Sequence, residues 1–150
     1  MGEVTATQLG FRMPAEWEPH EATWLAWPHE RSDWPVKFAP IPWVYGDIVR
    51  KLTRVERVRI LVEDAALEKS ARRVLAKCTA DMSAVEFFRW PTNRSWTRDY
   101  CPIFVRNDVC EIAITNWRGQ DPAIIQRLMG ALPNCTISEE LIARGSDDPE

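Results

Sequence analysis

Prolines and tryptophans crowd the first third of the chain and restrict the secondary structure that it can form. Six prolines and five tryptophans fall between residues 14 and 43. Proline lacks an amide N–H and breaks a helix interior, so one long helix is excluded here. The run from Glu21 to Trp27 is short, largely apolar and closed by Pro28, which predicts a buried strand.

Helix and strand patterns alternate beyond this segment. Apolar spacing predicts an amphipathic helix from Val44 to Val55, and a β-branched run predicts a strand from Val58 to Glu63. Asp64 is placed to cap a second helix, and Ala84 to Trp90 is typical of another strand. The apolar face of that second helix comprises Leu67, Ala71, Val74, Leu75 and Cys78.

A hairpin is predicted next. Its strands are expected at Pro102 to Val105 and Cys110 to Thr115, joined by a turn that contains Asn107 and Asp108. A further helix is expected from Ala123 to Leu132, before an acidic tail that frays. We therefore expect one mixed α/β domain of 150 residues.

Charge, hydropathy and cysteine spacing exclude several classes of partner. Nineteen basic and 22 acidic residues give a net charge of −3, the wrong sign for a protein that binds nucleic-acid phosphates. No apolar run approaches the roughly 20 residues of a membrane helix, and residues 1–6 lack a signal-peptide core. We therefore expect a cytoplasmic protein without nucleic-acid or membrane partners.

His20 and His29 fit no compact zinc motif, so we expect no metal, no cofactor and reduced thiols at Cys78, Cys101, Cys110 and Cys135.

The loop from Pro91 to Tyr100 is the strongest candidate for a functional site. It follows a predicted strand and holds a tryptophan, two arginines and an aspartate. On one interpretation, Arg98 and Asp99 form ordinary loop ion pairs while Trp96 caps the core. On the other, the same side chains bind a ligand, and the residue types alone do not decide between the two.

Two sequence motifs bear on the choice between a structural loop and a ligand-binding loop. The segment from Phe11 to Pro28 (FRMPAEWEPHEATWLAWP), followed by Asn93 to Tyr100 (NRSWTRDY), resembles the agmatine deiminase family, also called the bacterial-type peptidylarginine deiminase family. The resemblance runs from about Leu9 through Arg118. We therefore divide the chain into a deiminase-like region, residues 1–118, and an unassigned helix and tail, residues 119–150.

The resemblance implies a fold and a reaction. The fold is the pentein α/β propeller of five β-β-α-β blades. At roughly 40 to 50 residues a blade, this chain would form about three blades, and the ring would not close. The reaction is hydrolysis of agmatine to N-carbamoylputrescine and ammonia, in polyamine biosynthesis. By motif position, Asp99 matches the carboxylate that binds the guanidinium and Trp96 matches the aromatic of the pocket, while Arg98 is expected to hold the loop or to orient carboxylates. Trp27 and Pro28 are expected at the rim of the channel, with a place in the core as the alternative for Trp24 and Trp27.

The departures from the family concern catalysis. The nucleophilic cysteine of the family follows a histidine in a Gly-rich segment, its acid/base histidine accompanies a carboxylate, and neither motif occurs in these 150 residues. Cys78, Cys110 and Cys135 are expected to be small buried hydrophobes. Cys101 lies two residues from Asp99 and is the remaining candidate nucleophile, although no base is near it in the sequence.

Three hypotheses follow. The chain is part of an agmatine deiminase that is inactive alone, or a non-catalytic module that binds a guanidine or amine, or a module that pairs with another chain through open blade edges. Agmatine, arginine and peptidyl-arginine are not distinguished as substrates by the motifs present.

Overall fold

The computed structural model of the chain describes residues 6–115 and 122–131. Its contacts divide the chain into two units. One unit is Pro19–Thr97, and the other combines Met1–Glu18 with Arg98–Glu150. We describe each unit by itself.

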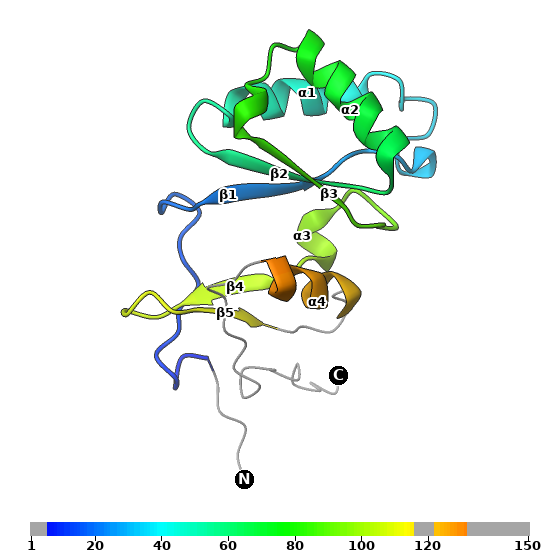
Figure 1. Ribbon diagram of the computed structural model, residues 1–150. Coiled ribbons are helices and arrows are strands. Elements are labelled where there is room, and N and C mark those ends of the chain that lie inside the picture. The colour runs from blue at the N-terminus through cyan, green and yellow to red at the C-terminus, as the bar shows by residue number, and fades with distance from the viewer. Residues whose placement is uncertain (1–5, 116–121, 132–150) are drawn as a thin grey trace. The chain divides into compact units, whose positions relative to one another are not determined.

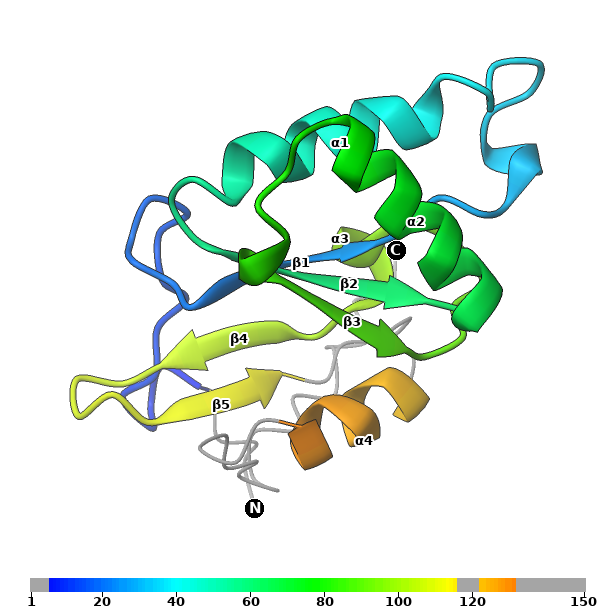
Figure 2. The same cartoon turned by 45° about the horizontal axis from the view of Figure 1, so that its top comes forward.

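The unit Pro19–Thr97 is built on a three-stranded parallel sheet. Strand β2 (Arg57–Val62) lies in the centre, between β1 (Ala22–Ala26) and β3 (Val85–Arg89). Figure 2 shows the three strands side by side and pointing the same way. Parallel neighbours need a crossover connection, and helices supply both crossovers here.

Helices α1 (Ile41–Leu52) and α2 (Ala65–Lys77) lie on the same face of this sheet (Figure 1). Helix α2 begins where the sequence predicts, because the Asp64 carboxylate accepts a hydrogen bond from the amide of Leu67 at 2.7 Å. A one-turn 3₁₀ helix, η1 (Arg31–Asp33), precedes α1, and another, η2 (Met82–Ala84), precedes β3.

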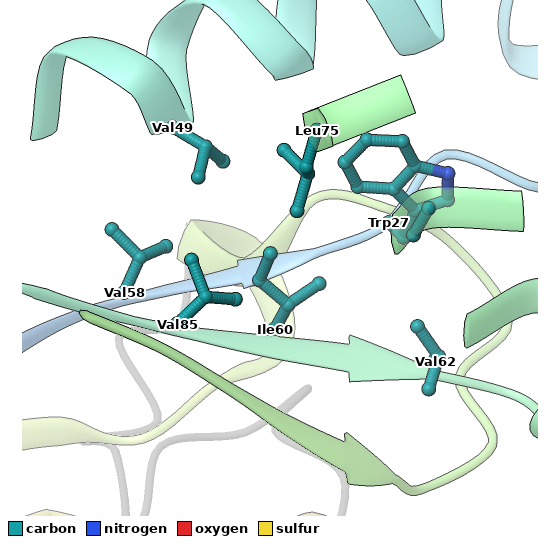
Figure 3. Close-up of a cluster of buried hydrophobic side chains, with 8 residues drawn as sticks. Trp27, Val49, Val58, Ile60, Val62, Leu75 and Val85 are labelled. Atoms are coloured by element: carbon teal, nitrogen blue, oxygen red, sulfur yellow. The ribbon is translucent and has the colours of Figure 1, made fainter. Parts of the chain in front are cut away.

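The core of this unit fills the space between the sheet and the two helices (Figure 3). Side chains alternate along β2, so Val58, Ile60 and Val62 enter the core while Arg59 points to the opposite face. Arg59 donates to Glu86 at 2.8 Å and to Glu21. The remaining buried members of the core are Trp27, Val49, Ala71, Leu75 and Val85.

The two helices approach closely at one glycine. A Cβ added at Gly46 of α1 would lie 2.5 Å from Cys78 Sγ and 3.3 Å from Val74 Cγ1. An added side chain would therefore require the Cys78 side chain, or the helix before it, to move. Gly46 therefore sets how near the two helices can pack.

The second unit contains an antiparallel hairpin of β4 (Ile103–Arg106) and β5 (Ile112–Thr115). Arg12 pairs with Arg106 in an isolated antiparallel bridge. Val105 and Ala113 are buried from the hairpin and pack with Leu9 and Phe11 of the N-terminal segment. Helix α4 (Pro122–Ala131) also belongs to this unit and buries Ile124, Ile125 and Leu128.

The structure confirms the α/β class and most of the predicted elements, with three corrections. Helix α1 begins at Ile41 rather than Val44, because Pro42 occupies the first turn, where a missing N–H costs nothing. A four-residue helix, α3 (Thr97–Tyr100), lies in the segment predicted to be a loop. Cys110 does not begin the second hairpin strand; it has φ of 65° and ends the turn two residues before β5. The predicted acidic tail lies outside the described residues.

No helix among the described residues combines the length and apolar character needed to cross a membrane.

Candidate functional site

Polar side chains gather where the three parallel strands end. His29 follows β1, Glu63 follows β2, and the segment 91–96, which we call the motif loop, follows β3. Ligand sites of open parallel sheets lie at the carboxyl ends of the strands, because the loops there meet at one edge. The motif loop, which carries Trp96, therefore lies at this edge of the sheet.

The motif loop is held against the segment that contains η1. Arg94 donates to the Asp33 carboxylate and, at 3.1 Å, to the Ser32 hydroxyl. The Trp34 and Trp96 rings pack with centroids 5.5 Å apart. Asp33 is almost wholly buried, whereas Trp96 remains 45% exposed. One face of Trp96 is thus packed, and much of the ring stays accessible.

His29 joins the end of β1 to the motif loop. Its Nδ1 lies 3.0 Å from the carbonyl oxygen of Trp27, and its Nε2 lies 2.9 Å from the carbonyl oxygen of Thr92. Glu63 contributes a carboxylate oxygen 3.6 Å from the same Nε2. The ring therefore links the three strand ends.

In the second unit, Asp99 lies in the single turn of α3 and is exposed. Among the described residues it makes no hydrogen bond or ion pair. Its neighbour Arg98 instead donates to the exposed Glu16 carboxylate at 3.0 Å. A carboxylate without a partner is open to a cationic ligand.

The second unit also fixes part of the first motif. Arg12 donates to both carboxylate oxygens of Glu18, at 2.7 and 3.0 Å, and the Ala15 amide donates to the same carboxylate at 3.0 Å. The hydrogen bond from Arg12 is the main reason that the pKa of Glu18 falls from 4.5 to about 2, with the Ala15 amide next. This ion pair closes the turn between Phe11 and Pro19.

The cysteines separate into three environments. Cys101 is half-buried, and Cys78 is half-buried against Gly46. The expectation that Cys110 is a buried hydrophobe is wrong: its thiol is exposed and accepts a hydrogen bond from Arg106 at 3.2 Å. A turn position forces Cys110 outward, since the chain reverses there. Cys135 lies outside the described residues.

Trp27 is 2% exposed and is a buried member of the core of its unit, which agrees with the core alternative for this residue. Pro28 is also buried. Within residues 6–115 and 122–131, no three His, Cys, Asp or Glu side chains gather as a metal site would require.

No sequence motif marks Asp33 or Trp34 as site residues, and His29 stands out in the sequence only as a histidine that fits no zinc motif. Their contacts join positions about 60 residues apart in the chain, which no local pattern reveals. The one sequence signal that could have indicated these contacts is the predicted order of parallel strands and helices. Loops that follow parallel strands meet at one edge, so the residues after Trp27 and after Trp90 were candidates for contact.

Comparison with known proteins adds the family. The profile of the Porphyromonas-type peptidyl-arginine deiminase family matches residues 12–140. The agmatine deiminase of Pseudomonas syringae pv. syringae is 32% identical over 108 residues, which are 72% of this chain and 28% of that protein. The agmatine deiminase of Pseudomonas aeruginosa (strain LESB58) is 30% identical over the same length. The chain thus spans little more than a quarter of these relatives.

Solved structures of agmatine deiminases also match this chain. The agmatine deiminase of Enterococcus faecalis matches with a TM-score of 0.64 and 27% identity, over 75% of this chain and 29% of that one. The agmatine deiminase of C. jejuni matches with a TM-score of 0.67 over 85% of this chain and 38% of that one, at 22% identity, and so shows a shared fold. With its two motifs in order and a profile match over most of its length, the chain belongs to the Porphyromonas-type peptidyl-arginine deiminase family.

Proposed function

We propose that this chain supplies the guanidinium-binding part of an agmatine deiminase site. The observation that carries the proposal is the state of Asp99: an exposed carboxylate, without a partner among the described residues, at the position where the family motif places its guanidinium ligand. The relatives at 30–32% identity are agmatine deiminases, which favours agmatine over arginine or peptidyl-arginine as the substrate.

The chemistry of the two proposed residues suits a guanidinium. This group is planar, cationic and rich in N–H donors, so a carboxylate can accept two parallel hydrogen bonds from it. An aromatic face attracts the cation by a further electrostatic contribution. Asp99 would provide the first interaction and Trp96, three residues earlier in the chain, the second.

The arginines of the same segment do not oppose this assignment. Arg94 is paired with Asp33, and Arg98 is paired with Glu16. Each cation is therefore neutralised by its own acid, and the charge left unpaired on this segment is the Asp99 carboxylate. A cationic substrate is attracted to such a segment rather than repelled.

Catalysis needs groups that the 150 residues do not offer at recognisable positions. A thiolate must attack the guanidinium carbon, and a base must move protons so that ammonia leaves. The family motifs for the histidine and the cysteine do not occur in these 150 residues. We propose that the chain alone binds agmatine and does not turn it over.

The finer architecture is also a proposal. Residues 1–118 would form the deiminase-like region as an incomplete pentein propeller of about three blades, with residues 119–150 added to it, in a cytoplasmic protein of polyamine biosynthesis. The TM-scores against agmatine deiminases support the propeller.

Because the described sheet ends in β1 and β3, each paired on one side by β2, a second candidate function is pairing with another chain through these edges. Self-association in sedimentation would support it, and a monodisperse monomer would count against it.

Calorimetric titration with agmatine tests the binding proposal. We expect Asp99→Asn to weaken binding about 10- to 100-fold, the size of one charge-assisted hydrogen bond. Asp108→Asn, at another exposed aspartate, removes the same charge and should leave affinity unchanged. Equal affinity of the chain and of Asp99→Asn would refute the assignment.

Release of ammonia and ureido product from agmatine, arginine and an arginyl peptide tests catalysis. We expect no release from any of them. Turnover that Cys101→Ser abolishes would instead make Cys101 the nucleophile and overturn the proposal that the chain is inactive alone.

A further inference from the structure

The His29 ring faces two hydrogen-bond acceptors. Both ring nitrogens lie within 3.0 Å of carbonyl oxygens, those of Trp27 and Thr92. A carbonyl oxygen only accepts, and a neutral imidazole carries a single N–H. A neutral ring would therefore leave one nitrogen lone pair against a carbonyl oxygen. A doubly protonated ring satisfies both contacts.

Several charged side chains lie near the His29 ring. Glu63, at the end of β2, places Oε1 3.6 Å from Nε2, and the His29 side chain is only 11% exposed. Glu30 is the next residue along the chain. Its carboxyl pKa is lowered mainly by the Ser32 amide, with smaller contributions from Arg94 and from His29. Arg94, the cation of the motif loop, is directed to Asp33 instead.

We propose that His29 is a positioning residue that holds the motif loop to the end of β1 as an imidazolium, so that attachment of the loop depends on a proton. Thr92, which receives one of the two hydrogen bonds, precedes Trp96 by four residues. Loss of the proton on Nε2 removes the bond to Thr92 and loosens the segment that carries Trp96. Nothing in this inference depends on what the loop binds, so it stands or falls separately from the proposed function.

The direction of the pH dependence follows from the geometry. The bond to Thr92 is present while Nε2 carries a proton, and it is lost when a rise in pH removes that proton. Histidine is the side chain whose charge ordinarily changes between about pH 5 and 8. Loosening of the motif loop should therefore follow the titration of this one ring.

Nitrogen-15 NMR of the full chain tests the protonation directly. The chain has two histidines, so His20→Gln leaves the His29 ring as the only imidazole in the spectrum. We expect both His29 nitrogens to give N–H signals with couplings to the carbonyl carbons of Trp27 and Thr92. A lone-pair nitrogen under conditions where the motif loop is ordered would overturn the proposal.

Relaxation dispersion at the amides of residues 92–96 tests the consequence. As the ring loses a proton, we expect the population of the detached loop to rise about tenfold, as for the loss of one charge-assisted hydrogen bond. His20→Gln is the matched control and should keep this pH response, because His20 faces Glu56 rather than the loop. His29→Gln should abolish the pH response. A pH response retained in His29→Gln, or a loop that stays attached while the ring titrates, would refute the proposal.

Discussion

The Arg12–Glu18 ion pair shows what a short motif can fix at the scale of single residues. Three donors converge on one carboxylate, two from the guanidinium and one from the Ala15 amide. Each favours the charged form of Glu18. Because its pKa is lower in the folded chain than in the unfolded one, Glu18 adds stability that is fully present above about pH 4.5.

Acid titration tests this pair. As the pH falls from about 4.5 towards 2, Glu18 gains a proton and its contribution to stability is lost. We expect the Glu18 carboxyl carbon to titrate in NMR with a midpoint of about 2. In Arg12→Gln, which removes the largest cause, the midpoint should move up towards 4.5. A midpoint near 4.5 in the unsubstituted chain would contradict the ion pair.

At this scale the sequence points to candidate residues only where a motif is local. Trp96 and Asp99 stand out because they occupy one short segment with a recognisable order of residues. The contacts that hold that segment could not be predicted in the same way. Thr92 is 63 residues from His29, and Asp33 is 61 residues from Arg94. Such contacts arise only when the strands have aligned.

At the scale of elements, Gly46 decides how α1 and α2 pack. Alanine normally stabilises a helix by about 0.5–1 kcal/mol relative to glycine. In Gly46→Ala, however, the new methyl would meet Cys78 Sγ at 2.5 Å, an overpacking that costs about 1–3 kcal/mol. We therefore expect net destabilisation in urea unfolding.

Two further variants make this test specific. Gly130 in α4 has no described atom within 4 Å of an added Cβ, so Gly130→Ala should be neutral or stabilising by up to about 1 kcal/mol. Adding Cys78→Ala to Gly46→Ala removes the sulfur and should recover part of the loss. If Gly46→Ala alone is as stable as the unsubstituted chain, the close approach is not real.

Element boundaries were predictable where side-chain chemistry marks them. The start of α2 is predictable because Asp64 precedes it, and an aspartate can cap the amides of a first turn. The four residues of α3 are too few for an apolar period to show, and so the sequence suggested a loop. Cys110 was misplaced because its left-handed backbone is unusual for a residue with a side chain.

At the scale of the whole molecule, the Pro19–Thr97 unit encloses a core of its own. Every buried member of that core lies between Trp27 and Val85. A segment with its own buried sheet and covering helices can fold as a domain. We expect a fragment of residues 19–97 to unfold cooperatively by circular dichroism.

The control for this fragment is a core truncation. Ile60 is fully buried on the central strand, so Ile60→Ala should cost about 2–5 kcal/mol. That is a large share of the roughly 5–15 kcal/mol that stabilises a typical domain. A fragment that melts gradually, with or without Ile60→Ala, would show that the unit needs the rest of the chain.

The parallel pairing of β1 with β2 and of β2 with β3 also affects the order in which strand pairs form during folding. Neither pair can form by simple reversal of the chain, because α1 and α2 intervene, whereas β4 and β5 are joined by a short turn. Hairpins close in about 1–10 μs, while non-local pairings form more slowly. During synthesis, the sheet stays incomplete until β3 has left the ribosome. The His29 ring can therefore meet Thr92 only after β3 and the residues that follow it have been synthesised.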